Sequence, residues 1–264
     1  MKAKIAVYIL LTIVAFVFLG PLFWKVDQNE INLNYINTPP NAIHPLGTDE
    51  LGRDVLARLM AGGRISLFVG AVATIVQLAL GLFFGILAAI LPERLQNILM
   101  RFIDAIMTIP FYILAVSIAG FVGPSIKNLI IIIAVFTWAP CARMVRTEIL
   151  RIKNEEFIMY AKLLKQDTVK ITVKHFIPNI KHLLFTRATL SMAQAIMMEA
   201  SLSFLNLGVR QPNASWGNML TGAINIVTIA VHRHLWLPAA LLIFLTVMSI
   251  NIISRSIEQN ENYA

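Results

Sequence analysis

Long uncharged runs alternate with short polar segments along the 264-residue chain. As helices that rise about 1.5 Å per residue, runs of this length can cross a hydrocarbon layer roughly 30 Å thick. The pattern predicts an all-α, polytopic membrane protein with one transmembrane domain over residues 1–264. The expected spans lie at residues 5–24, 66–90, 101–122, 128–147, 179–207 and 235–254.

Two segments fit this pattern less well. Lys181, Arg187 and Glu199 interrupt the run at 179–207, which we count as a span because its flanking segments need opposite sides of the membrane. Residues 211–231 carry no charge, but proline, glycine and asparagine residues break the run. A re-entrant or an interfacial segment is expected there rather than a seventh crossing.

A charged stretch precedes the second run. Thr48 can cap a helix and Gly62–Gly63 can end it, so an amphipathic helix is expected over residues 48–61, lying at the outer interface. A plain interfacial anchor is the simpler interpretation of the same pattern. The charged residues of this helix fall in two pairs four positions apart, which are Asp49 with Arg53 and Asp54 with Arg58.

Composition agrees with a membrane protein, because 58% of the residues are hydrophobic and only 14% are charged. Soluble domains carry about 25% charged residues. The net charge of +8 does not indicate nucleic acid as a partner, since an excess of Lys and Arg in short loops reports orientation in a membrane protein. Membrane lipid is the expected surrounding. Cys141 is the only cysteine, so no intrachain disulfide can form.

Charge sets the predicted orientation. The first apolar run is longer than a signal-peptide core and has no cleavage site after it, so it is expected to remain as a span with its N-terminus in the cytoplasm. Between Arg143 and Lys181, nine basic residues stand against four acidic ones. Four crossings return this segment to the cytoplasm, in agreement with the positive-inside rule. Both termini are therefore expected in the cytoplasm.

The segment at 148–178 is the sizeable polar region on that side. Its first part has helical periodicity up to about Leu164, and Asp167 or Thr168 can cap a second short helix that ends before Pro178. Two helices joined by a tight turn would form a docking knob for a soluble partner. A basic loop that only fixes the topology is the other interpretation.

Four stretches of the chain, in order, carry a family resemblance. They are HPLGTDELGRDVLARLMAGGRISLFVG at 44–70, MRFIDAIMTIP at 100–110, WAPCARMVRTEIL at 138–150 and EASLSFLNLGVRQPNASWGNML at 199–220. Together they resemble the inner-membrane permeases of the dipeptide/oligopeptide/nickel family of ABC importers, and specifically the second of the two permease subunits.

The resemblance implies a six-span permease of the bacterial cytoplasmic membrane. Its implied partners are a second homologous permease, two cytoplasmic ATPases that bind ATP and Mg, and an extracytoplasmic binding protein. Peptides are the implied cargo, and nickel or a metal chelate is the alternative cargo of the same machinery. This chain departs from the family pattern at three positions: it has Asn206, Gln211 and Ala214 where the family usually has glycine, proline and proline.

The knob resembles the coupling loop of that family, whose pattern is Glu-Ala-Ala, three residues, Gly, and a later Leu-Pro. Only Ala161 of the triplet is retained, and Lys165 stands where glycine is usual. If the turn keeps a positive φ, the lysine costs about 1 kcal/mol. Either the turn has another shape, or the partner ATPase has a matching groove. The residues expected to couple to the ATPase are Glu156, Tyr160, Ala161, Lys165, Asp167, His175 and Pro178.

Polar residues inside the spans are candidates for the substrate pathway. Glu199 is the foremost of them, because its carboxylate could meet a peptide ammonium group, although it could also pair with an arginine. Arg101 and Asp104 lie one helical turn apart and are expected to form a structural pair. The other pathway candidates are Gln77, Gln194 and Asn251, for which a bridge between neighbouring helices is the alternative role.

The sequence carries no motif for chemistry of its own. It has no phosphate-binding loop, no His-Glu-x-x-His and no Gly-x-Ser-x-Gly, so no catalytic residue and no bound cofactor are expected. His232 and His234 flank an arginine and make a poor cation site, so no metal ligand is expected. An ion-coupled secondary transporter is the rival from another class; it predicts paired inverted halves, which the sequence does not show. A non-transporting membrane scaffold is a further rival.

Overall fold

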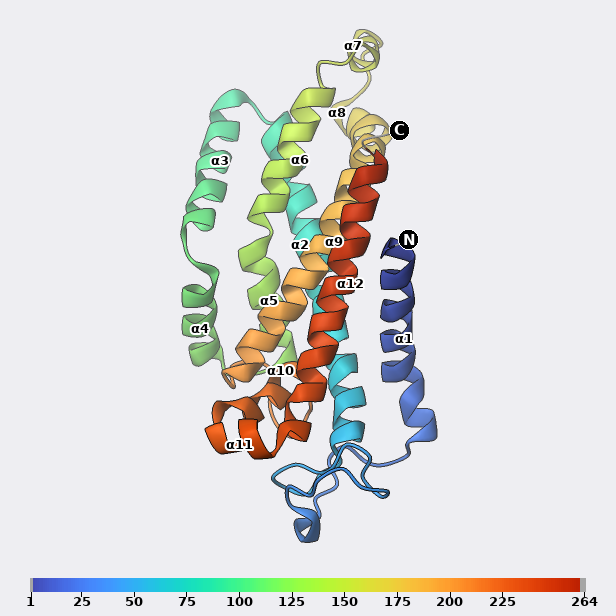
Figure 1. Ribbon diagram of the computed structural model, residues 1–264. Helices are drawn as coiled ribbons and strands as arrows, with labels where there is room; N and C mark the ends of the chain where they lie inside the picture. The colour runs from blue at the N-terminus through green and yellow to red at the C-terminus, as the bar shows by residue number, and fades with distance from the viewer. Residues whose placement is uncertain (1, 262–264) are drawn as a thin grey trace.

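A computed structural model describes residues 2–261, apart from the side chains of residues 162, 227, 260 and 261. The regular secondary structure of this part of the chain consists of helices, without a β-strand. Eight longer helices form an elongated bundle, and shorter helices lie at its two ends (Figure 1). The longer helices are α1 Lys2–Phe23, α2 Val55–Ile90, α3 Glu93–Thr108, α4 Phe111–Val122, α5 Ile126–Thr137, α6 Ala139–Ile152, α9 Ile177–Phe204 and α12 Leu237–Glu261.

Several of these helices are long and apolar enough to cross a membrane, as a polytopic membrane protein requires. Within the described residues α1, α2 and α12 qualify singly, and the count rises to five if each bent pair, α3 with α4 and α5 with α6, is one span. Helix α9 does not qualify by composition, yet it runs the length of the bundle between α2 and α12 (Figure 1). The count of six spans stays a prediction.

The second helix differs from the expectation at its N-terminal end. The separate helix predicted at 48–61 is wrong, because α2 begins at Val55 and continues through Gly62–Gly63 without a break. Its N-cap is Asp54, whose carboxylate accepts a hydrogen bond from the Ala57 amide at 2.7 Å. The amphipathic pattern therefore belongs to the first turns of the long helix itself.

The third and fourth predicted spans are broken helices. The chain bends by 82° between α3 and α4, where Pro110 lacks an amide hydrogen and disfavours helical backbone at Ile109. A second bend of 40° separates α5 from α6 at Trp138. The ranges 101–122 and 128–147 thus each contain parts of two helices, and α6 continues to Ile152.

Helix α2 is the centre of the bundle, and it packs against α1, α5, α6 and α9. Small residues allow the closest of these approaches. A Cβ atom added at Gly81 would lie 2.6 Å from the side chain of Cys141, and one added at Gly85 would lie 2.7 Å from the carbonyl oxygen of Ala142. Glycine at these positions lets α2 and α6 pack with their backbones close together.

Short elements gather at the two ends of the bundle. At one end lie the loop at 24–54 and the segment 211–231, which forms α10 Trp216–Met219, η3 Leu220–Ile224 and α11 Ile226–Val231 (Figure 1). The remaining turns near this end are η1 Leu33–Tyr35 and η4 Arg233–Leu235. At the opposite end lie α7 Glu156–Leu163 and α8 Thr168–Ile171. As expected, 211–231 does not form a long helix that could cross the membrane.

Candidate functional site

Helices α7 and α8 form an elbow at the end of the bundle, defined here as residues 156–176. One face of the elbow is fully packed. Ile158, Ala161, Ile171 and Phe176 are buried in one apolar cluster with residues of α6 and α9, including Ile149. Because this cluster is continuous with the bundle, the elbow is fixed to the ends of two long helices.

The other face of the elbow is apolar and exposed. Tyr160 is 63% exposed and Leu163 is 76% exposed, although neither side chain is of a type that favours water. Five further apolar side chains share this exposure, namely Phe157, Met159, Leu164, Val169 and Val173. An exposed apolar surface of this kind marks a site where another protein or a membrane binds.

The turn of the elbow keeps the geometry that a glycine would supply. Lys165 has φ of +52°, in the left-handed region, and the Gln166 amide donates a hydrogen bond to the Ala161 carbonyl at 3.1 Å. This bond closes the end of α7 in the usual manner of a left-handed helix cap. A differently shaped turn, the first of the two alternatives for the lysine, is therefore wrong.

The seven residues expected to couple to an ATPase divide into different environments. Tyr160 and Lys165 are exposed, and Glu156 begins α7 on the surface. Ala161 is buried and supports the elbow from inside, so it offers no contact surface. Asp167 is the N-cap of α8, and the His175 ring lies 5.9 Å from the ring of Phe157.

The sequence predicts that the second short helix ends before Pro178, and this prediction is wrong. Helical backbone continues from α8 through the wider turn η2, Thr172–Phe176, into α9, where Pro178 occupies the first turn. The proline withholds one amide hydrogen from this continuous helix, directly after the wider turn η2. The elbow is thus joined to α9 without a loop.

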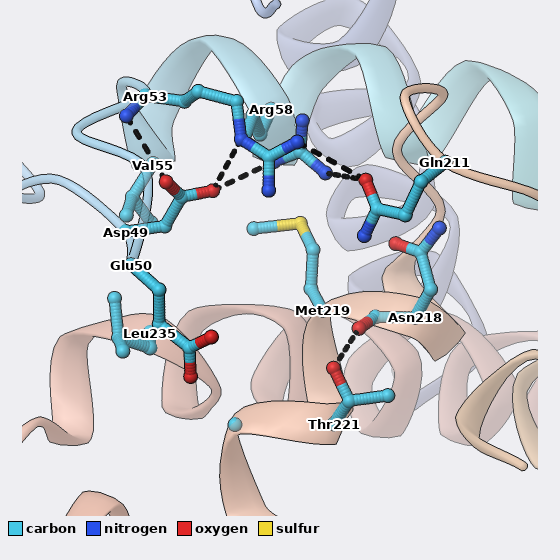
Figure 2. A pocket seen from close by; sticks show the side chains of 11 residues that line it. Asp49, Glu50, Arg53, Val55, Arg58, Gln211, Asn218, Met219, Thr221 and Leu235 are labelled. Carbon is cyan, nitrogen blue, oxygen red and sulfur yellow. Dashed lines mark hydrogen bonds and ion pairs between the residues drawn. The ribbon is translucent and has the colours of Figure 1, made fainter. Parts of the chain in front are cut away.

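At the opposite end of the bundle, charged side chains form a buried cluster (Figure 2). The Asp49 carboxylate accepts from Nε of Arg53 at 2.7 Å and lies 3.4 Å from Nε of Arg58. Both arginines donate to Oε1 of Gln211, at 3.1 and 3.4 Å, and Arg58 also donates to the Pro212 carbonyl at 3.3 Å. These bonds connect the 24–54 loop, the start of α2 and the segment after α9 around a cavity of about 100 Å³.

One of the two predicted pairs in this cluster is correct and the other is not. Asp49 and Arg53 form the expected ion pair. Arg58 instead lies beside Asp49, because the Asp54 carboxylate caps α2 and accepts from Nε1 of Trp24 at 3.2 Å. A turn rather than a helix at 48–54 brings these groups together.

Glu199 lies in a separate buried network next to this cluster. Its two carboxylate oxygens accept from the hydroxyl groups of Ser66 and Ser203, each at 2.7 Å, and its side chain has no exposed surface. Ser66 in turn accepts from the Trp216 amide at 3.1 Å, and Ser203 accepts from the Val209 amide at 3.1 Å. The network fastens the segment after α9 onto α2 and α9, and this arrangement gives no support to a pathway role for Glu199.

The other three polar pathway candidates differ in whether they are buried or accessible. Gln77 is buried and donates to the Thr137 carbonyl at 2.9 Å and to Ser191 Oγ at 3.2 Å, so it bridges helices. Gln194 is exposed on α9, and Asn251 lines an open groove on α12. These two are the pathway candidates that the fold leaves accessible.

The expected pair of Arg101 with Asp104 is wrong. The Asp104 carboxylate pairs with Arg143, which joins α3 to α6. Arg101 lies exposed on α3. Sequence spacing indicates only neighbours along one helix, whereas the partner of Asp104 comes from another helix.

Two histidines lie near the start of α12, and one of them contacts the 24–54 loop. The His232 and His234 rings lie 5.8 Å apart, and Nε2 of His234 lies 3.3 Å from the Thr48 carbonyl oxygen. Burial lowers the pKa of His234, which favours the neutral ring at this contact. Among the described residues, no group of three or more His, Cys, Asp or Glu residues is placed to hold a metal ion.

Comparison with known proteins identifies related sequences over most of the chain. The family model described as "Binding-protein-dependent transport system inner membrane component" matches residues 81–260. A putative peptide permease protein of Brucella suis is 36% identical over 253 residues, which cover 96% of this chain and 84% of that protein. The dipeptide transport system permease protein of Bacillus subtilis is 33% identical, covering 97% and 80%. The nickel transport system permease protein of Escherichia coli is 33% identical, covering 96% and 91%.

Proposed function

Since this chain belongs to the dipeptide/oligopeptide/nickel family of ABC importer permeases, we propose that it is the transmembrane subunit through which an ATP-driven importer moves di- or oligopeptides. Its membrane is the cytoplasmic membrane. The chain is not an enzyme in this proposal; ATP and Mg bind to two separate cytoplasmic ATPases. A second, homologous permease and an extracytoplasmic binding protein complete the importer.

The single observation that carries the proposal is the elbow. A surface that only fixed the topology would need no more than its basic residues, such as Lys170 and Lys174, whereas this surface also presents exposed Tyr160, Leu163 and neighbouring apolar side chains. Its other face is packed into the bundle through Ile158 and Phe176. A force applied to such a rigidly mounted surface reaches α6 and α9 directly, which supports a role in coupling to the ATPases.

Helix α9, together with α2 against which it packs, leads from the elbow to the opposite end of the molecule. Helix α9 carries Glu199 and α2 carries Arg58, and these residues hold the segment after α9 and the 24–54 loop. In the proposal, a rocking motion of α2 and α9 therefore changes the elbow and the outer end together. Two discrete packings of stiff helices are the known physical basis of such alternating motions.

The proposed topology has six spans with both termini in the cytoplasm. The basic segment between Arg143 and Lys181 supports it, because the elbow then lies in the cytoplasm. The translocation path would form between this chain and the second permease. Gln194 is the residue proposed to face it, since it is polar and lies on an accessible face of α9.

Peptides are the first choice of cargo, because the relative reported above at 36% identity is named as a putative peptide permease, and one at 33% identity is named as a dipeptide permease. Nickel or a metal chelate is the second candidate, favoured by the similar nickel permease. The ligand bound by the importer's binding protein would distinguish the two.

The elbow is tested with Leu163→Glu, which places a charge in the exposed apolar face. We expect the ATPases to be lost from the purified complex and uptake of labelled peptide to fall at least tenfold, because a carboxylate buried against an apolar groove costs several kcal/mol. The matched control is Asn154→Asp, which adds the same charge on the exposed turn before α7, outside the apolar face.

Copurification of the second permease reports whether the variant chain has folded. Full uptake by the Leu163→Glu variant would contradict the coupling role. A wild-type chain that transports without any copurifying ATPase would support the ion-coupled secondary transporter instead.

A further inference from the structure

Arg255 stands on a ridge of α12 between two apolar grooves. Met248, Ile252 and Arg255 lie three or four residues apart on one helix face, and all three line both grooves. One groove, of about 560 Å³, runs along α12 toward Met197 of α9. The other, of about 810 Å³, lies between α12 and the first turns of α1.

The two grooves are open at the side of the bundle and lined mostly by hydrocarbon. The groove toward α9 is bordered by Ile243, Phe244 and Val247, and the groove toward α1 by Ile5, Ile9 and Leu245. Such a surface suits acyl chains, since it offers few polar groups to satisfy. It is a lateral surface of helices that qualify as membrane spans.

Two cations mark one end of the grooves. Lys2 lines the groove between α1 and α12 together with Arg255, and the first turn of α1 lies beside the C-terminal part of α12 (Figure 1). Among the described residues, neither side chain has a recorded hydrogen bond or ion pair. Glu258 is one turn beyond Arg255 and exposed, but the structure records no ion pair between them.

From this arrangement we infer that Lys2 and Arg255 bind the phosphate of an anionic phospholipid, whose two acyl chains lie in the two grooves flanking Arg255. The guanidinium group presents a planar fork of donors that matches phosphate oxygens, and Lys2 adds a second positive charge. Basic pockets between membrane helices at the cytoplasmic surface are suited to anionic headgroups.

Charge and shape favour a lipid over a protein as the occupant. A partner helix packed into one groove would have to desolvate Arg255 and supply an acidic residue opposite it. A lipid meets both demands at once, because its phosphate stays at the level of the cations while its chains fill the apolar grooves on either side of the ridge.

The inference is tested by native mass spectrometry of the purified transporter complex titrated with phosphatidylglycerol, and with phosphatidylcholine for comparison. Removing one cation, in Arg255→Gln or Lys2→Gln, is expected to weaken phosphatidylglycerol binding about fivefold, the effect of one basic residue near a membrane surface. Lys4→Gln is the matched control: Lys4 is exposed and two residues from Lys2 but does not line the groove. The Lys4→Gln variant is expected to bind phosphatidylglycerol with the affinity of the wild type.

A second variant tests the groove without changing any charge. Ala3 lines the groove between α1 and α12, so Ala3→Phe fills it and is expected to weaken phosphatidylglycerol binding while both cations remain. Equal affinity in wild type and Arg255→Gln overturns the inference, as does an equal loss in Lys4→Gln, which would indicate unspecific surface charge. Loss of the second permease from the Arg255→Gln complex, with lipid binding unchanged, assigns the ridge to a protein interface and also overturns it.

Discussion

At the scale of single residues, the carboxylate of Glu199 shows how a buried charged group is held between helices. It has no exposed surface and accepts hydrogen bonds from Ser66 and Ser203, which belong to α2 and α9. The same two hydroxyl groups accept from the amides of Trp216 and Val209. Removal of the carboxylate therefore leaves several buried polar groups with fewer partners.

We predict that Glu199→Ala lowers the free energy of unfolding by about 3 kcal/mol, because it leaves unpaired hydroxyl groups and a cavity. Gln194→Ala is the control on the same helix and is expected to change stability by no more than about 0.5 kcal/mol, since its side chain is exposed. Unfolding of the purified complex in mixed micelles measures both. Equal stability of the two variants would show that the network is not structural.

Lys165 shows what sequence can and cannot say about one residue. The family pattern indicates glycine at this position, and the physical cost of a lysine depends on whether φ is positive. The structure gives a φ of +52° and a hydrogen bond from Gln166 to Ala161 that closes the cap. Only the packed elbow decides this, because Ala161 is buried and fixes the end of α7.

At the scale of helices, α1 and α2 are joined by a contact that the sequence does not indicate. Pro21 has no amide hydrogen for the Val17 carbonyl four residues earlier in α1. Arg64 of α2 supplies the missing donor through Nε, at 3.0 Å, and donates to the Phe18 carbonyl through Nη2 at 3.1 Å. The arginine thus satisfies the Val17 carbonyl, which would otherwise lack a donor within the helix.

A double-mutant cycle tests this contact. We predict that Arg64→Met lowers the free energy of unfolding by about 2 kcal/mol in the wild-type background. In the Pro21→Ala background the loss is expected to be smaller by about 1 kcal/mol, because Ala at position 21 restores a helical donor for Val17. Strict additivity of the two substitutions, measured by unfolding in mixed micelles, would rule out the proposed compensation.

Helix ends were harder to predict than helices. The residues at 55–61 show the expected amphipathic pattern, but capping by Asp54 rather than Thr48 moves the helix start and frees 48–54 to form a turn. The bend at Pro110 follows from a missing amide hydrogen that sequence does display. Its angle depends on how α3 and α4 pack, which sequence does not display.

At the scale of the whole molecule, the proposed topology places the elbow and the 24–54 loop on opposite sides of the membrane. We predict that Lys165→Cys reacts with a membrane-impermeant maleimide only from the cytoplasmic side. Ile43→Cys, in the exposed outer loop, is expected to react only from the opposite side. Both are measured in intact cells and inverted vesicles.

The chain suits this measurement because its one native cysteine, Cys141, is fully buried and gives little background. Labelling of both positions from the same side would contradict the topology and, with it, the coupling role of the elbow. The lipid experiment is read separately from this one, since it measures binding directly.

The sequence by itself determined the helical membrane character and the family, and it predicted helical periodicity at 148–178 while leaving a two-helix knob and a basic loop as alternatives. These follow from the length of apolar runs, from motif order and from helical periodicity, all of which are local along the chain. The comparison with known permeases confirms the family.

Only the tertiary structure decided which polar side chains meet. Asp104 pairs with Arg143, Asp49 with Arg58, and Glu199 with Ser66, and each pair joins residues from different elements. The physical reason is that a charged or polar group takes the donor that packing brings within hydrogen-bonding distance, and that donor need not be near in sequence. The same holds for the grooves beside Arg255, which exist only because α1, α9 and α12 lie side by side.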